Sequence, residues 1–143
     1  MPITDYFTAA DDRSALAGLA EGPIAAGMPT LESKNLDPVV NLGTLESLLT
    51  GMSYDEVIEG PRQGDLISDP EASPESHIVA VTDRLRDALV AADDARLVET
   101  AARWSRTEEL EGTDPDGLAG FLRDLAALAR EGGESHLYCW WAL

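Results

Sequence analysis

Cys139, His136 and His77 are the side chains in this sequence best suited to nucleophilic catalysis or metal binding. A thiol activated by an imidazole and an acid would form a nucleophile site, and thiol and imidazole groups are the usual ligands of zinc. The chain supplies only one cysteine and two histidines for either purpose. His136 and Cys139 are three positions apart in an expected strand, so they would lie on opposite faces. We therefore predict no catalytic residues, no metal ligands and no cofactor.

Phosphate binding and acid–base catalysis find little support in the remaining residues. The stretches GLAEG and GPRQG lack both the strand–loop–helix context and the lysine of a phosphate-binding loop, and Lys34 is the only lysine. Pairs of acids can bind magnesium or act as acid and base. With 27 acidic residues in the chain, such pairs arise by chance. Asp93 and Asp94 are better explained as caps of a helix.

The elements that would position these side chains are mostly helices between two terminal strands. ITDYFT at residues 3–8 and HLYCWWAL at the end of the chain combine β-branched, aromatic and apolar residues, which is typical of strands. Capping residues, glycines and apolar stripes three and four residues apart predict the helices. We expect them from Thr8 to Gly22, Asp37 to Gly51, Ser53 to Gly60, Ser73 through Leu89, Asp93 to Trp104 and Asp114 to Gly132.

This order predicts an α+β fold dominated by helix, in which amphipathic helices pack on a small sheet that includes the N-terminal and C-terminal strands. A length of 143 residues suits one domain, residues 1–143, with a long loop around 61–74 rich in Gly, Pro, Ser and Asp. No apolar stretch is long enough to span a membrane, and the N-terminus lacks the pattern of a secretory signal. With a single cysteine, these features predict a cytoplasmic protein.

Aromatic residues are concentrated in the last strand, where alternation places Tyr138 and Trp140 on one face and Cys139 and Trp141 on the other. Both faces are apolar, which favours a strand buried on both sides. The alternative leaves Tyr138 and Trp140 open as an interface for another chain or for a second copy in a homodimer. Trp104, between two arginines, is a third candidate interface residue, with packing against a neighbouring helix as its alternative.

Charge is the most marked property of the composition, with a formal net charge of −17 at pH 7. Nucleic acids and anionic membranes would be repelled, so we expect neither as a partner. Two interpretations of the acidity stay open. In the first, the acidity reflects solubility, genome composition or adaptation to high salt. In the second, it forms an acidic face that binds a basic protein.

Three short strings resemble a known family in their order along the chain. A strand containing Tyr6 and Phe7 comes first, LLTGMS then ends a helix, and VTDRL precedes a long helix and an apolar final strand. This layout resembles the YfbM-type family of small uncharacterised bacterial proteins over most of the chain, although the spacings in the middle differ. The family has no established activity. The resemblance implies an α+β cytoplasmic domain and adds no site residues.

Together these observations favour a protein-binding module, such as an inhibitor or immunity-type protein for a basic partner. Acidic surface accelerates association with a basic protein and sets specificity. The alternatives are a small-ligand-binding domain or enzyme with a pocket near the 60–74 loop, and a structural subunit of a homo-oligomer. Buried charges converging in a pocket would favour the ligand-binding alternative.

Overall fold

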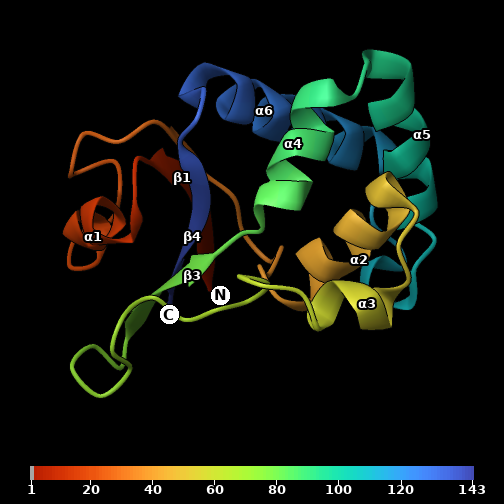
Figure 1. Cartoon of the computed structure of the whole chain (residues 1–143). Helices are drawn as coiled ribbons and strands as arrows, with labels where there is room; N and C mark the ends of the chain where they lie inside the picture. Colours follow the sequence, from red (N-terminus) through yellow and green to blue (C-terminus); the bar gives the residue numbers. More distant parts are fainter. Residues whose placement is uncertain (1) are drawn as a thin grey trace.

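A four-stranded antiparallel sheet lies at the centre of the molecule, in a computed structural model that describes residues 2–143. The strands are β1 (Ile3–Ala9), β2 (Thr30–Leu31), β3 (Ser76–Ala80) and β4 (His136–Ala142), in the order β2–β1–β4–β3. β1 and β4 pair along their whole length, from Ile3 opposite Ala142 to Ala9 opposite His136 (Figure 1). The predicted α+β domain, with both terminal strands in one sheet, is confirmed.

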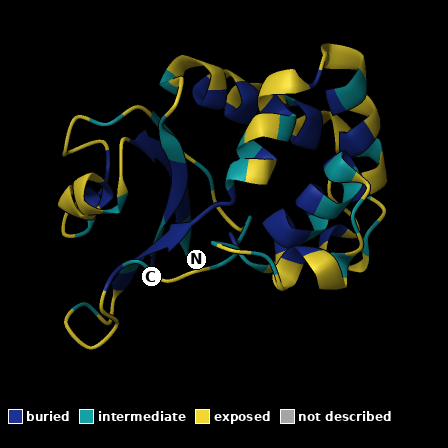
Figure 2. Ribbon diagram, in the orientation of Figure 1, coloured by how far each residue is buried: buried dark blue, intermediate teal, exposed yellow. Residues whose placement is uncertain are grey.

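Helices cover both faces of this sheet to unequal extents. The helices are α1 (Asp12–Ala15), α2 (Val40–Thr50), α3 (Tyr54–Ile58), α4 (Asp83–Ala91), α5 (Asp94–Trp104) and α6 (Pro115–Gly132), with 3-10 turns η1 (Leu16–Gly18) and η2 (Glu108–Leu110). Helices α2 to α6 form the larger layer, and α1 with η1 lies across the sheet from them (Figure 1). The sheet is therefore shielded from water on both sides, and most of the residues in its strands are buried (Figure 2).

Two apolar cores result from the alternation of side chains along the strands. Tyr6, Leu137 and Cys139 point toward the larger helical layer and join the core of α2, α4, α5 and α6. Phe7 and Tyr138 point the other way, with their rings stacked at 5.5 Å between centroids. The final strand is thus covered on both faces, as the core interpretation of its sequence predicted.

Capping side chains fix where the helices of the second half begin. The carboxylate of Asp93 accepts a hydrogen bond from the backbone N–H of Arg96 at 2.8 Å, and the predicted start of α5 is confirmed. Asp114 caps α6 with proline at its first position, also as predicted. The capping box of Ser53 and Glu56 at α3 is present in full.

The helix predicted from Ser73 is wrong over its first part. Ile78 and Val81 have helical spacing to Leu85, but they lie in or next to strand β3, and helix α4 begins only at Asp83. The run Ile78 to Val81 contains three β-branched residues, which suit a strand that pairs with β4. The hydroxyl of Thr82 then accepts from the N–H of Leu85 at 3.0 Å and starts the helix.

The helix start predicted at Thr8 is wrong as well, because β1 continues through Ala9. Asp11 is the N-cap of α1 instead and accepts from the N–H of Ser14 at 2.7 Å. Strand β2 lies between the predicted helices of residues 8–22 and 37–51, where no element was predicted. It is only two residues long, too short to produce a readable alternation.

Candidate functional site

A small hollow lies where the loop of residues 59–75 meets the start of α4. Its lining residues are Pro61, Arg62, Thr82, Asp83 and Arg84. The volume of about 160 Å³ is well below the roughly 300 to 1,000 Å³ of ordinary small-molecule pockets. The hollow adjoins the 60–74 loop, near which the ligand-binding alternative placed its pocket, and its size restricts an occupant to water or a small ion.

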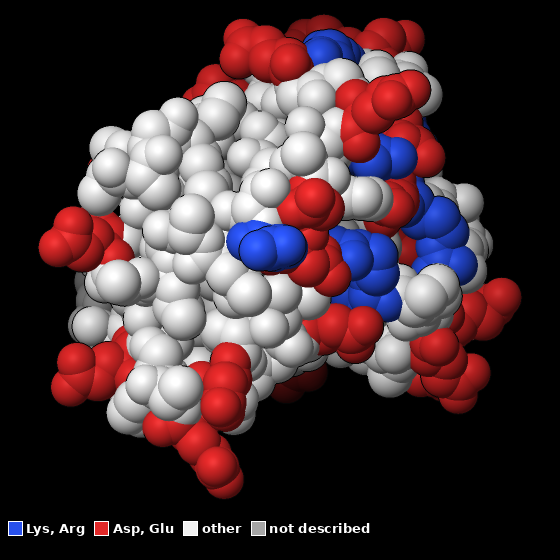
Figure 3. Space-filling view, turned by 60° about the vertical axis from the view of Figure 1, so that its left-hand side comes forward, with Lys and Arg blue, Asp and Glu red and all other residues white. Residues whose placement is uncertain are grey.

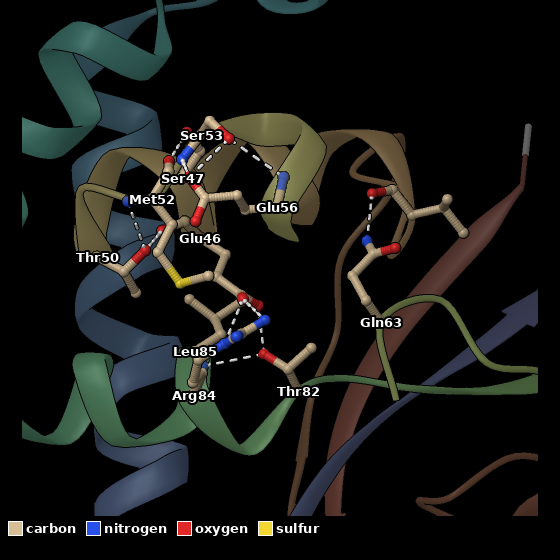
Figure 4. Close-up of polar contacts among 11 residues, drawn as sticks. Glu46, Ser47, Thr50, Met52, Ser53, Glu56, Gln63, Thr82, Arg84 and Leu85 are labelled. Atoms are coloured by element: carbon tan, nitrogen blue, oxygen red, sulfur yellow. Dashed lines mark hydrogen bonds and ion pairs between the residues drawn. The ribbon is translucent and has the colours of Figure 1, made fainter. Parts of the chain in front are cut away.

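One wall of the hollow is closed by an ion pair around Glu46, a carboxylate that is 1% exposed (Figure 4). Arg84 donates to Oε2 of Glu46 through Nε at 3.2 Å and lies at 3.1 Å through Nη2. The hydroxyl of Thr82 donates to the other carboxylate oxygen. Gly60 provides the space for the guanidinium of Arg84, because a Cβ at Gly60 would collide with Nη2. The arrangement satisfies a buried charge and ties α2 to the start of α4.

The opposite wall is formed by Arg62, whose guanidinium lies between an acid and an aromatic ring. Nη2 of Arg62 is 3.1 Å from Oδ1 of Asp12, and its guanidinium carbon is 5.5 Å from the ring centroid of Tyr138. The hydroxyl of Tyr138 donates to the same Oδ1 at 2.7 Å. These hydrogen bonds, that of Tyr138 first and that of Arg62 second, lower the pKa of Asp12.

Two features of Arg62 are unusual. Its backbone has a φ of 72°, in the left-handed region that non-glycine residues rarely adopt. Its Nε is buried and has no hydrogen-bond partner among residues 2–143. An unpaired buried donor is costly, and strained backbone occurs preferentially at binding sites.

His136 and Asp83 form a second polar pair beside the hollow, with Nδ1 of His136 2.7 Å from Oδ1 of Asp83. Arg86 shares this acid at 3.3 Å. A carboxylate at Nδ1 fixes the orientation of the imidazole ring. Cys139 lies on the other face of the sheet and is 0% exposed, and burial raises the pKa of its thiol. The geometry therefore excludes a nucleophile formed by Cys139 and His136.

The three candidate interface residues occupy interior or partly covered positions. Tyr138 and Trp104 are both 0% exposed, so neither side chain is accessible to a partner in the folded chain. Trp104 packs near Phe121, with ring centroids 6.2 Å apart. Trp140 is partly buried, and its indole N–H donates to the carbonyl of Leu19 at 2.9 Å. The segment of α1 and η1 covers Tyr138 and Trp140, whereas Trp104 packs inside the larger helical layer.

Sequence reasoning missed the acids and arginines of this site, which come from four separate segments of the chain. Only Glu46 left a readable signal, since it shares an apolar helical stripe with Leu42, Leu45 and Leu49. A carboxylate at such a position must find a buried partner. Asp12, Arg62 and Asp83 look like ordinary surface residues until the fold brings them together.

Metal binding and membrane insertion find no support in residues 2–143. No group of three or more His, Cys, Asp or Glu in this range could hold a metal ion. None of its helices combines the length and apolar character needed to cross a bilayer.

The sequence and structure match no protein-family model, no curated protein and no solved structure. The resemblance to the YfbM-type family therefore stays a prediction.

Proposed function

We propose that the protein is a small acidic binding module whose partner is a basic protein. One observation carries the proposal: within residues 2–143, most of the basic side chains take part in ion pairs or hydrogen bonds, whereas most of the carboxylates form no ion pair. Five of the ten lysines and arginines form ion pairs within residues 2–143, namely Arg62, Arg84, Arg86, Arg96 and Arg123. Arg130 donates instead to backbone carbonyls at the end of α4.

The acids are far less engaged. Six of the 27 acidic residues pair with an arginine in the described part of the chain, namely Asp12, Glu46, Asp83, Asp87, Asp94 and Glu99. On the face shown in Figure 3, basic side chains lie beside acidic ones, while acidic side chains also project at the rim. The negative field outside the molecule is therefore not neutralised by its own cations.

Such a field acts on a partner before contact. It accelerates association with a positively charged protein and makes the complex sensitive to salt, because surface charges are screened over about 10 Å at 0.1 M. A nuclease is a fitting class of target, since its basic surface serves to bind nucleic acid. The protein would then act as an inhibitor or immunity-type protein that covers that surface. Nucleic acid and membrane surfaces would be repelled.

The setting of this proposal is the bacterial cytoplasm, as the YfbM-type resemblance implies. A single cysteine, buried at position 139, suits a reducing compartment.

Affinity capture from an extract of the source cells, followed by titration calorimetry with the purified partner, tests the proposal. We expect one stoichiometric basic protein, retained at low salt and released at high salt, with log Kd rising steeply with log salt. A variant with Glu109→Lys and Glu111→Lys should weaken the complex if η2 contributes to the field, and these exposed residues have no internal partner to lose. Recovery of only the protein itself would replace the proposal with homo-oligomerisation. Failure to retain any protein would refute it.

A second candidate function rests on the unpaired Nε and strained backbone of Arg62. The hollow between Arg62 and Arg84 would hold a small anion such as phosphate or a carboxylate. Its arginines already pair with Asp12 and Glu46, which reduces their attraction for an anion and makes this function secondary. Saturable chemical-shift changes at Arg62 on adding inorganic phosphate would support it, and their absence would exclude it.

A further inference from the structure

Strand β2 forms one edge of the sheet, and part of its backbone faces outward. Tyr6 lies opposite Leu31 in the pairing with β1, and the carbonyls of Pro29 and Ser33 accept from β1 at 3.3 and 3.1 Å. Backbone groups alternate in direction along an edge strand, so those of Thr30 and Glu32 point away from the sheet. Outward N–H and C=O groups of this kind are a template for one more strand.

Hollows lie on both sides of this edge. The first, of about 370 Å³, lies between β2 and α6 and is lined by Pro29, Thr30, Leu31, Asp124, Ala127, Leu128 and Glu131. The second, of about 320 Å³, is lined by Ile3, Asp5, Glu32, Ser33 and Lys34. Successive side chains of an added strand point to opposite faces of the sheet. An added strand would therefore direct its side chains alternately toward the two hollows, the arrangement by which extended peptides are recognised.

The hollow next to α6 has the chemistry to accept a lysine or arginine. Asp124 and Glu131 are both exposed, stand seven residues apart on α6, and have no ion-pair partner within residues 2–143. Leu31 and Leu128 provide apolar surface between them. A long basic side chain matches this pattern, because its methylene groups cover apolar surface while its charge reaches the carboxylates.

The second hollow is also acidic on balance, with two carboxylates and Lys34. Asp5 is 7% exposed, and its pKa is raised, first by burial and to a lesser degree by the nearby charge of Glu32. A cation in this hollow would relieve the repulsion between the two acids. Charge therefore favours a basic strand from either side of the edge.

Two other occupants of the edge are less suitable. A second copy of this chain would bring the same carboxylates of α6 close to one another across a two-fold axis, and like charges there are destabilising. A long strand is also excluded, because β2 itself is only two residues long.

We propose that a short, extended and basic segment of the partner protein adds to the sheet beside β2, with a lysine or arginine between Asp124 and Glu131. The inference rests on the proposed function and specifies where and how the basic partner binds. Its backbone would bond Thr30 and Glu32, while its alternate side chains would occupy the two hollows. Affinity would come from main-chain hydrogen bonds, and selectivity for basic segments from the carboxylates.

A blocked seven-residue peptide of alternating valine and lysine, added to the ¹⁵N-labelled full chain, tests the site. We expect saturable shifts and slowed hydrogen exchange at the amides of Thr30 and Glu32. The control is the same sequence with N-methyl groups on alternate residues, made in both possible registers. N-methylation keeps the charge of the peptide and removes the backbone N–H groups that would bond to β2. The control peptide should bind about tenfold more weakly, as expected when hydrogen bonds worth about 1.4 kcal/mol are lost.

Charge reversal on the protein provides the matched comparison. Asp124→Lys with Glu131→Lys should weaken the unmodified peptide about tenfold or more, because attraction at the hollow becomes repulsion. Glu109→Lys with Glu111→Lys changes the net charge equally at a distant exposed turn and should weaken it much less. Equal effects of the two double variants, or equal binding of the N-methylated peptide, would overturn the proposal.

The result also separates this proposal from the proposed function. Peptide binding mapped to a surface other than β2 would overturn the edge site and leave a module for basic partners intact. Absence of peptide binding at millimolar concentration would overturn the edge site. If the cell extract also yields no basic protein, both proposals fail.

Discussion

Replacing Arg84 with alanine is the most direct test of how the site is stabilised. Glu46 is 1% exposed, whereas the side chain of Arg84 is 40% exposed. Removing the exposed member of the pair therefore leaves the buried member without its counter-charge. We expect Arg84→Ala to destabilise the protein more than replacement of the buried acid does.

The expected loss of unfolding free energy follows from the exposed fractions of the Glu46 and Arg84 side chains. Breaking a fully buried pair by removing one partner costs about 3 to 5 kcal/mol. Because Arg84 is partly solvated and Thr82 still donates to Glu46, the loss should fall to about 2 kcal/mol. The reverse change, Glu46→Met, fills the same volume with an apolar side chain and frees Arg84 to turn toward water. Its cost should be about 1 kcal/mol, mainly from the hydroxyl of Thr82 that loses its acceptor.

Urea unfolding followed by far-UV circular dichroism measures these changes, with the slope of the transition as a check on two-state behaviour. The double variant Glu46→Met with Arg84→Ala should be more stable than Arg84→Ala alone, because no buried charge then lacks a partner. Arg103→Ala, an exposed residue outside any ion pair in residues 2–143, is the control and should change stability by less than about 0.5 kcal/mol.

Two outcomes would refute this reasoning. If Arg84→Ala and the double variant unfold at the same urea concentration, the charge of Glu46 is not the source of the loss. If Glu46→Met costs more than Arg84→Ala, the acid stabilises the fold through contacts other than its counter-charge.

Two further predictions concern the face of the sheet covered by α1. Tyr138→Phe removes a hydrogen bond to Asp12 and should cost about 1 to 2 kcal/mol at pH 7. Because the folded pKa of Asp12 is lowered, this stabilisation is present above its unfolded pKa of about 3.9 and declines as pH falls through the folded pKa. The unfolding curves of the two proteins should therefore converge at pH values below the unfolded pKa. Gly22→Ala should cost more than Gly27→Ala, because both have positive φ, of 97° and 80°, but only a Cβ at Gly22 meets the ring of Trp140, at 3.1 Å. Equal urea midpoints for the two alanine variants would contradict the ring contact.

The sequence predicted those elements whose signals are local. Asp93 and Asp114 cap their helices through bonds to residues two or three positions away, and such signals survive in any tertiary context. The final strand was also predictable, because both of its alternating faces are apolar. These two kinds of signal were enough to derive the α+β fold.

The elements that were missed depend on distant pairing. Ile78 and Val81 fit the spacing of the helix that follows, and only the pairing of β3 with β4 makes this stretch a strand. Strand β2 exists because Leu31 lies opposite Tyr6, a contact between two separated segments. Propensity over a window of residues cannot detect either pairing.

The candidate site was less predictable than the fold for the same reason. Arg62 comes from the long loop, and it acquires a role only when Asp12 and Tyr138 lie beside it. Its left-handed backbone is equally invisible in the sequence, because no glycine or asparagine marks it.

The same contacts connect the stability of the fold to its proposed function. Each arginine that bonds a buried acid or a carbonyl stabilises a junction between elements, as Arg84 joins α2 to α4 and Arg130 joins α6 to the end of α4. Each also becomes unable to neutralise an acid at the surface. A chain that supplies only ten basic residues against 27 acidic ones keeps a strongly negative exterior without any dedicated acidic segment. Replacing the exposed acids Asp124 and Glu131 with lysine should therefore weaken partner binding about tenfold or more while leaving the unfolding transition unchanged.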